Sequence, residues 1–367
     1  MSNTNVAEGK KRRGAGFLRW LGRVVLGLLI LLLGLAAVGA IYQAIATARD
    51  AQTYKPLDQM VDVNGIQMRL DCSGTGSPTV VLEAGGESSA IVWARVQGDV
   101  AQFTRVCSYD RAGYGWSDPV REELVPQRVA EMLHDLLAQA GEKPPYLMVA
   151  HSMGGVYVRT FTAVYPADVV GMVLVDTSHE NQTQLAKQLT PAEIRESPES
   201  IEAAKAQRTI LKLLPIAEPL GLLRAFKIMD AGAASLQLPE EKKAAFLAES
   251  YRTGYMAAYL REVNMMEAYF EQGGKPNSLG DIPLIVLSAE LNTQKMSEQY
   301  APSVRSKLTT DILQQQVDAL NGLHAELAGL STRGKWIIVP GTGHFIQLDA
   351  PQVVTDAIRE VFGQVRQ

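Results

Sequence analysis

The sequence predicts an α/β fold in which helices flank a mostly parallel sheet, preceded by one transmembrane helix. Three observations predict it. Short apolar segments alternate with segments of helical periodicity on both sides of residues 177–280. The stretch between them is rich in helix formers and charges and has no strong strand pattern, so we expect an inserted helical cap there. A long uncharged apolar run lies near the N-terminus.

That apolar run, residues 24–48, is long enough as a helix to cross about 30 Å of hydrocarbon. Residues 1–23 carry six Lys and Arg against one Glu, and such a basic cluster tends to stay cytoplasmic. We therefore expect a basic cytoplasmic tail, a signal anchor and an extracytoplasmic domain in a single-pass membrane protein. The alternative is a cleaved signal peptide, since Ala44, Ala46 and Ala48 are small residues of the kind that precede cleavage.

The composition narrows the class of partner. The chain has 367 residues, of which 47% are apolar and 20% charged, and a net charge of -4 gives no basic surface that would neutralise phosphates. We expect a small-molecule or lipid substrate and no nucleic acid. Cys72 and Cys107 are too few for a disulfide scaffold and match no zinc pattern. We expect two buried thiols, with pairing as the alternative if the domain faces an oxidising compartment.

The first part of the sheet domain, residues 57–176, begins with an alternating pattern around Asn64 and Gly65 that predicts a hairpin over residues 60–72. Apolar runs then predict strands, and periodic segments predict helices. The expected strands are 79–82, 105–109, 146–150 and 169–175, with helices over 127–140 and 153–165. Fully apolar strands such as 169–175 are typical of a buried parallel sheet.

The same alternation returns in the second part of the sheet domain, residues 281–367. We expect strands over 282–287 and 336–339 and a closing helix over 351–362. Within the cap, residues 213–226 are unusually apolar and interrupted by prolines. They are expected to form cap core, with a substrate cavity or lipid as alternative neighbours.

Ser152 lies where the strand 146–150 meets the following helix. A serine hydroxyl is a poor nucleophile unless a base takes its proton and a sharp strand-to-helix turn projects its oxygen into the site. Ala150 and Gly154, two residues before and after Ser152, are small enough for the backbones around such a turn to approach closely. The segment therefore predicts a nucleophile elbow.

With this elbow in place, the sequence resembles the α/β-hydrolase superfamily over residues 61–363. The family usually has glycine where this chain has Ala150. The resemblance implies that His344, in the glycine-containing loop after the last strand, is the base that accepts the Ser152 proton. Relatives that act on epoxides or haloalkanes use aspartate at the position of Ser152, so the resemblance disfavours their chemistry.

The resemblance also indicates an oxyanion hole. Such a hole needs backbone N–H groups aimed at the developing negative charge. Met153, directly after the nucleophile, is expected to provide one, and Gly86, in the loop after the strand 79–82, the other. Asp110, Arg111 and Ser117 match a further family signature and are expected to brace the oxyanion loop.

The acid of the triad has two candidates. Asp176 directly follows the strand 169–175, and a carboxylate there can orient His344 and stabilise its imidazolium. Glu290 follows the strand 282–287, close to Asn292, where the customary aspartate would align. We favour Asp176 because the order Ser152, Asp176, His344 is that of the family.

These residues predict a serine hydrolase that cleaves carboxylic esters, including lipid or lysolipid esters, through an acyl-enzyme on Ser152. The alternatives are a small peptidase similar to proline iminopeptidases, in which Glu262 or Glu267 would hold a free amine, and an inactive membrane-anchored binding protein. No motif calls for a metal or an organic cofactor. The sequence predicts no oligomeric state.

Overall fold

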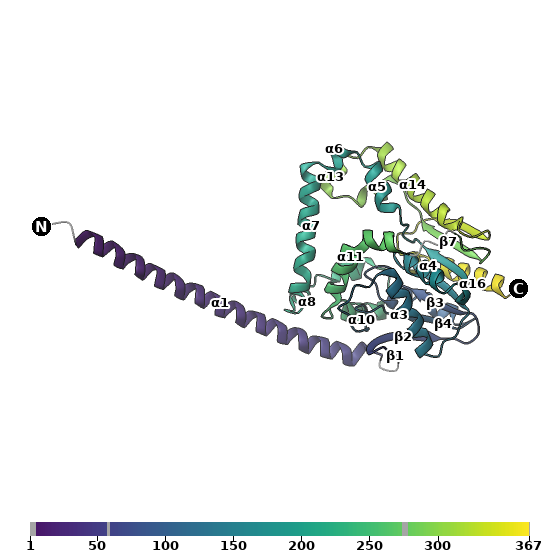
Figure 1. Ribbon diagram of the computed structural model, residues 1–367, viewed down its shortest axis with the longest axis horizontal. Coiled ribbons are helices and arrows are strands. Elements are labelled where there is room, and N and C mark those ends of the chain that lie inside the picture. Colours follow the sequence, from purple (N-terminus) through teal and green to yellow (C-terminus); the bar gives the residue numbers. More distant parts are fainter. Residues whose placement is uncertain (1–4, 57–58, 274–277, 367) are drawn as a thin grey trace.

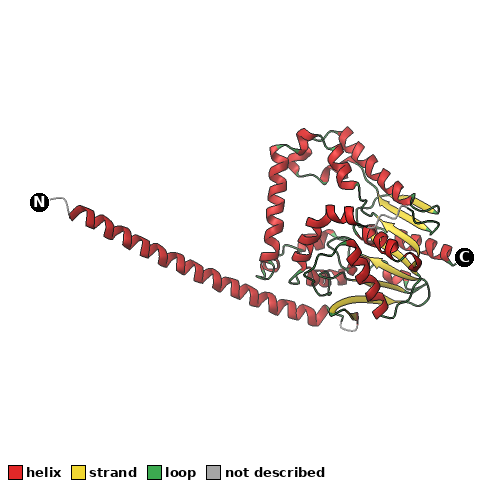
Figure 2. Cartoon of the chain, in the orientation of Figure 1, coloured by secondary structure: helices red, strands yellow, loops and turns green. Residues whose placement is uncertain are grey.

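The computed structural model describes residues 5–56, 59–273 and 278–366. An eight-stranded sheet with the order β1-β2-β4-β3-β5-β6-β7-β8 lies at its centre, with helices on both faces (Figure 2). From β4 onward along this order, each neighbouring pair is parallel. The predicted α/β fold class, with a mostly parallel sheet and flanking helices, is confirmed.

The strands follow the predicted apolar runs closely. The hairpin consists of β1 (Met60–Val63) and β2 (Ile66–Ser73), and Asn64 and Gly65 at its turn both have positive φ. The remaining strands are β3 (Thr79–Glu83), β4 (Val106–Tyr109), β5 (Tyr146–His151), β6 (Val169–Val175), β7 (Leu284–Ala289) and β8 (Gly334–Val339). Every residue of β3, β4, β5 and β7 is buried, as expected of strands covered on both faces.

Two apolar layers cover the sheet. On one face pack α3 (Pro126–Gln139), α4 (Gly154–Val164) and the end of α14 (Thr310–Ala328). On the other face pack α2 (Gln97–Val100) and α16 (Pro351–Val365). The C-terminal ends of β3, β5 and β6, which lead into the active-site segments, are therefore buried between the two layers.

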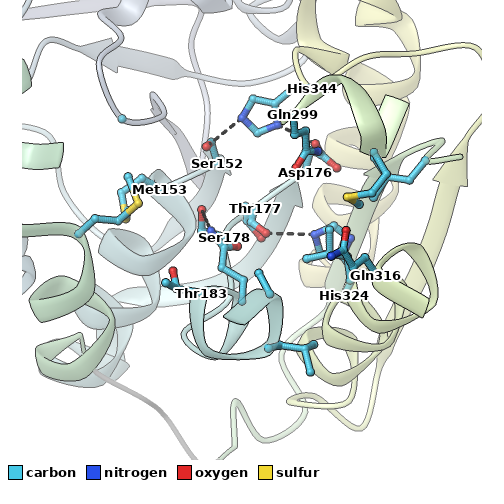
Figure 3. A pocket seen from close by; sticks show the side chains of 18 of the residues that line it. Ser152, Met153, Asp176, Thr177, Ser178, Thr183, Gln299, Gln316, His324 and His344 are labelled. Atoms are coloured by element: carbon cyan, nitrogen blue, oxygen red, sulfur yellow. Dashed lines mark hydrogen bonds and ion pairs between the residues drawn. The ribbon is translucent and has the colours of Figure 1, made fainter. Parts of the chain in front are cut away.

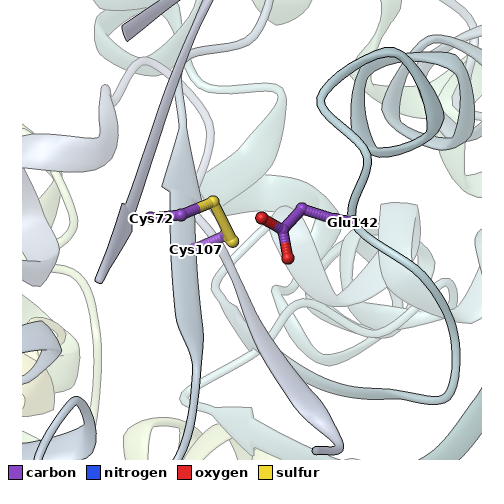
Figure 4. A group of neighbouring side chains, drawn as sticks. All are labelled: Cys72, Cys107 and Glu142. Carbon is purple, nitrogen blue, oxygen red and sulfur yellow. A yellow bond between two sulfur atoms is a disulfide. The ribbon is translucent and has the colours of Figure 1, made fainter. Parts of the chain in front are cut away.

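Cys72 and Cys107 form a disulfide, so the expectation of two free thiols was wrong (Figure 4). They are directly opposite each other in the antiparallel pair of β2 and β4, which brings their Cα atoms within 4.1 Å. The carboxylate of Glu142 lies beside the two sulfur atoms. This group does not form a metal site, because the sulfurs are bonded to each other and Glu142 pairs with Arg105 at 2.6 Å.

Between β6 and β7 the chain forms an insert, which we define as residues 182–272. Its helices are α5 (Gln182–Leu189), α6 (Ala192–Arg195), α7 (Pro198–Ala217), α8 (Leu222–Ala225), α9 (Asp230–Ser235), α10 (Glu240–Ser250) and α11 (Tyr255–Gln272). Between β7 and β8 follow α12 (Thr293–Glu298), α13 (Pro302–Arg305) and α14, which also contacts α5. The helical layer above the sheet is thus built from two stretches of chain.

Helix α1 (Asn5–Tyr54) is one continuous helix that projects from the sheet domain (Figure 1). Its segment Arg19–Tyr54 is long and apolar enough, by length and composition, to cross a membrane. The helix continues beyond the predicted boundary at residue 48 because its last turns are bound to the insert. Gln43 donates to the Tyr251 carbonyl at 2.6 Å, and Asp50 pairs with Arg224 at 2.7 Å.

Candidate active site

Ser152 occupies the sharp turn between β5 and α4 with a left-handed backbone, φ +51°. The turn requires a small residue two positions later. A Cβ on Gly154 would lie 2.6 Å from the carbonyl oxygen of Ala84, closer than real Cβ atoms approach other atoms. Ala150, where the family usually has glycine, is fully buried within the sheet, opposite Glu83 of β3. The predicted elbow geometry is present.

The structure brings Ser152, His344 and Asp176 together from three separate segments (Figure 3). The Nε2 atom of His344 lies 3.0 Å from the Ser152 hydroxyl oxygen. Its Nδ1 atom lies 2.7 Å from Oδ2 of Asp176. In this chain of contacts the imidazole can accept a proton from the serine while the carboxylate fixes its orientation.

Asp176 follows β6 directly and, like Ser152, has a positive φ, +45°. Its second oxygen, Oδ1, accepts a hydrogen bond from the Ala289 N–H at 2.8 Å. Burial opposes ionisation, but the hydrogen bond from His344, the positive charge His344 can carry and the Ala289 N–H together hold the pKa of Asp176 below its ordinary value. Asp176 is therefore ionised at neutral pH.

Glu290, the alternative acid, is directed elsewhere. Its Oε2 accepts a hydrogen bond from the N–H of Gly341 at 3.1 Å, and the side chain is exposed. It contacts the loop that carries His344 rather than the imidazole. Asn292 begins α12 by accepting from the N–H of Lys295 at 2.9 Å.

The two predicted backbone donors, Gly86 and Met153, lie next to each other. A Cβ on Gly86 would be 3.5 Å from the Cβ of Met153. Among the described residues, neither N–H has a hydrogen-bond acceptor. Two unpaired donors beside a serine hydroxyl form the arrangement that an oxyanion needs.

The family model described as the alpha/beta hydrolase family matches residues 74–357, which is most of the chain and includes the site residues described above. The chain belongs to the alpha/beta hydrolase family.

Two curated relatives match most of the length of this hydrolase, and a third matches a shorter part. The Bacillus subtilis protein YqjL is 24% identical over 289 residues, 79% of this chain and 85% of the relative. An AB hydrolase superfamily protein of Gibberella zeae is 23% identical, covering 79% of this chain and 87% of the relative. A vacuolar membrane protein of Saccharomyces cerevisiae is 34% identical over 107 residues, 28% of this chain and 17% of its own length.

Solved structures show the same fold. An epoxide hydrolase from Bacillus megaterium superposes with a TM-score of 0.57 at 15% identity, covering 83% of this hydrolase and 100% of that chain. A thermophilic esterase from Thermogutta terrifontis superposes with a TM-score of 0.51 at 18% identity, covering 84% and 98%. These neighbours share the fold and differ in their chemistry.

The oxyanion loop of this hydrolase is braced by buried charges, as expected for Arg111 and Asp110. Arg111 donates to the carbonyl oxygens of Ala84 and Gly85 at 2.8 and 2.6 Å and pairs with Glu83 at 2.6 Å. Asp110 accepts from the Ala90 N–H at 2.8 Å. The two carbonyl groups that precede Gly86 are therefore held in place.

Glu262, from helix α11 of the insert, completes this brace. Its carboxylate accepts hydrogen bonds from the hydroxyls of Tyr114 and Tyr157 at 2.5 and 2.6 Å and from the Glu87 N–H at 2.9 Å. Arg111 lies 3.4 Å away. The sequence offered Glu262 only as a holder of a free amine, because no spacing links α11 to a loop about 175 residues earlier. Its buried position is saturated by protein donors.

Two further histidines, His151 and His324, contact the segments that carry His344 and Asp176. The Nε2 atom of His151 is 2.9 Å from the carbonyl oxygen of His344, and burial lowers the pKa of His151 to about 3. The imidazole of His151 is therefore neutral and donates to the loop that carries His344. His324 of α14 contacts the Thr177 carbonyl at 3.1 Å and the Ser288 hydroxyl at 2.7 Å, beneath Asp176.

A cavity of about 630 Å³ opens beside Ser152. Ser152, Asp176 and His344 lie at its base, and Gly86 and Met153 also line it. The walls farther from Ser152 are mainly apolar and come from α5, α11, α12 and α14, including Leu185, Leu189, Val263, Met266, Met296 and Leu320. Residues 213–226 do not line this cavity, so that alternative for the apolar run of the insert was wrong.

Proposed function

We propose that this hydrolase is a serine esterase in which Ser152 is the nucleophile, His344 the general base and Asp176 the acid. The observation that carries the proposal is the contact chain of 2.7 and 3.0 Å through His344, beside the free N–H groups of Gly86 and Met153. Each part of acyl transfer then has a group in position.

In the proposed reaction, His344 Nε2 takes the Ser152 proton as Oγ bonds to the carbonyl carbon. The N–H groups of Gly86 and Met153 stabilise the resulting oxyanion. The bond to the leaving alcohol breaks as His344 returns the proton to its oxygen. A water molecule, deprotonated by His344, then attacks the acyl-enzyme, and the acid leaves as Ser152 regains its proton.

The cavity supports esters of apolar acids as the substrates. Leu185, Val263 and Met266 offer a wall against which an acyl chain gains burial energy, about 0.8 kcal/mol for each buried CH₂. The insert, acting as a cap, would thus select the acyl group. Lipid and lysolipid esters fit this requirement, as do small apolar esters.

The other chemistries have less support. Epoxide hydrolysis in this family uses aspartate where this chain has Ser152. For an aminopeptidase, Glu262 is saturated by protein donors, and Glu267 is exposed and paired with Lys187. Apart from Asp176 and Glu262, Glu87 is the carboxylate among the described residues that line the cavity. A peptidase would have to depend on Glu87 to hold the amine.

The test uses the full chain in detergent or bilayers. A fluorophosphonate probe should label the wild type, and Ser152→Ala should abolish labelling and lower ester turnover by about 10⁴-fold or more. Across p-nitrophenyl esters, kcat/KM should rise with acyl length until the cavity is filled. Faster cleavage of aminoacyl-naphthylamides would favour the peptidase, and a folded sample that does not label would favour an inactive binding protein.

We further propose that α1 crosses the membrane once and that the hydrolase domain is extracytoplasmic. The basic residues before the apolar run and the disulfide both support this side, since disulfides persist in oxidising compartments. Asp356 is exposed on α16, so a thiol introduced by Asp356→Cys should react with an impermeant maleimide in intact cells. The native cysteines are paired and should not react. Labelling only after lysis would place the domain in the cytoplasm.

A further inference from the structure

Helices α7 and α8 of the insert leave a large apolar surface uncovered. No residue of α7 is buried. We define the apolar rim as the exposed residues Ile210, Leu213, Ile216, Leu222, Phe226 and Ile228. Phe226 alone exposes 72% of its surface. Exposed apolar residues gathered on neighbouring turns, unlike scattered ones, mark a binding surface.

The turn between α7 and α8, in the middle of the rim, contacts α1. The backbones meet at Gly39, where an added Cβ would lie 2.3 Å from the Leu220 carbonyl oxygen. Gly221 approaches the carbonyl oxygen of Gly39 and the ring of Tyr42 in the same way. In Figure 1, α8 reaches α1 part-way along its length, and α7 runs across the direction of α1. The part of α1 before Gly39 projects beyond this face.

The length of free apolar helix is shorter than a bilayer core. From Val24, the first residue after the last basic side chain of the tail, to Gly39 there are 15 steps, which span about 22 Å at 1.5 Å each. The hydrocarbon core is about 30 Å thick. If α1 spans it from Val24, the core extends past the level of Gly39, where Leu220 and Gly221 contact α1, so exposed side chains beside this contact, such as Leu222, would meet lipid rather than water.

Basic residues accompany the apolar rim. Lys205, Arg208 and Lys212 are exposed on α7 with helical spacing that places them on one face. None of the three forms an ion pair with another residue that the structure describes. Apolar residues next to exposed cations are typical of helices that lie in the headgroup region of a membrane.

From these observations we propose that α7 and α8 form a lipid-binding surface, in which the rim enters the bilayer and the three cations contact anionic headgroups. The proposal depends on the membrane crossing of α1 proposed above, but not on the esterase activity. The partner is a phospholipid bilayer with net negative charge. The surface would hold the hydrolase domain against the leaflet that α1 has just crossed.

The experiment measures immersion depth on the full chain in nanodiscs that contain zwitterionic and anionic phospholipid. Nitroxides are attached to single thiols at Phe226→Cys and Leu213→Cys, with Asp356→Cys on the opposite side as the aqueous control and Leu32→Cys in α1 as the deep control. Collision with oxygen reports lipid, and collision with a water-soluble nickel chelate reports water. Fluorophosphonate labelling of the same samples reports the active site separately.

We expect the oxygen-to-nickel collision ratio at positions 213 and 226 to exceed that at 356 by tenfold or more. Ratios equal to that at 356 would overturn the proposal, and so would a water-exposed probe at position 32. Adding anionic lipid should move the probe at position 213 deeper into the bilayer. The variant that also carries Lys205→Gln, Arg208→Gln and Lys212→Gln should lose this effect. Immersion that does not depend on anionic lipid in either chain would refute the headgroup contacts.

Discussion

Ser152 and Asp176 both adopt backbone conformations that side-chain-bearing residues rarely occupy, with φ of +51° and +45°. Each directly follows a buried parallel strand, and each side chain contacts His344. Such conformations cost about 1–3 kcal/mol and persist where the surrounding structure imposes them. The two residues are therefore held by β5 and β6 in positions that serve the site rather than the local backbone.

A single substitution tests the proposed role of Asp176. Asp176→Asn keeps the shape but removes the charge that stabilises a protonated His344, so kcat should fall by about 10³–10⁴-fold. The matched control is Glu290→Gln, which changes a carboxylate after the neighbouring strand and should alter kcat less than tenfold. Steady-state ester hydrolysis measures both, and the reverse ranking would transfer the acid role to Glu290.

Glu249, in helix α10, should make the free energy of unfolding depend on pH. Burial, and repulsion from Asp110, raise the pKa of Glu249 to about 8 in the folded protein, against an ordinary value of 4.5. Between these values the folded state binds more protons than the unfolded state, so the free energy of unfolding decreases as pH rises through this interval.

Glu249→Gln removes this titration while its amide oxygen can still accept the hydrogen bond from Ser89. From pH 5 to pH 8, the wild type should lose about 1–3 kcal/mol more stability than the variant. Denaturant unfolding of both proteins at a series of pH values measures the difference. Parallel stability profiles for the two proteins would contradict the assignment.

At the scale of elements, the elbow depends on a close approach between the start of α4 and the end of β3. Gly154→Ala would force its Cβ against the Ala84 carbonyl, so it should lower the melting temperature and abolish probe labelling. Gly322→Ala, inside α14 with no atom within 4 Å of its added Cβ, should instead stabilise the protein by up to about 1 kcal/mol. Equal effects of the two substitutions would show that the elbow tolerates a Cβ.

Helix α11 is connected to the oxyanion loop through Glu262. Glu262→Gln leaves Arg111 without part of its counter-charge and should cost about 3–5 kcal/mol of stability, together with a drop in kcat. On the same helix, Glu267→Gln removes an exposed pair with Lys187, which water already screens, and should leave the melting temperature almost unchanged. Thermal unfolding and ester turnover measure both variants. If Glu262→Gln changed neither quantity, Glu262 would not brace the loop.

The elements themselves were largely predictable, because apolar runs and helical periodicity are local signals. The strands of the sheet and the helices after Ser152 and before β5 lie within a few residues of the predicted limits. The contacts of Arg111 with Glu83 and Glu262 were not predictable, because they join residues 28 and 151 positions apart with no shared spacing. The choice between Asp176 and Glu290 was open for a related reason, since both follow neighbouring parallel strands.

For the whole molecule, the disulfide joins the antiparallel hairpin to the parallel part of the sheet. It closes a loop with a sequence separation of 35, for which chain-entropy reasoning gives a stabilisation of about 3–4 kcal/mol. Changing both cysteines to serine should lower the free energy of unfolding by about that amount, and reducing agent should have a similar effect on the wild type. An unchanged melting temperature in both experiments would mean that the bond does not form in solution.

The pairing could not be predicted from sequence because it depends on register. Cys72 and Cys107 are opposite each other only because β2 pairs with β4 rather than with β3, which comes next in the chain. The extent of α1 was missed for a similar reason. Its charged end remains helical because Asp50 meets Arg224, a residue of the distant insert.

The binding of Gln43 and Asp50 to the insert also determines how this enzyme would meet its substrates. A flexible linker lets a domain sample a wide volume around its anchor, whereas the end of α1 is bound directly to the insert. The height of Ser152 above the membrane would then be constant. Encounters would be limited by lateral diffusion in one leaflet, and a substrate on an opposing surface would be out of reach.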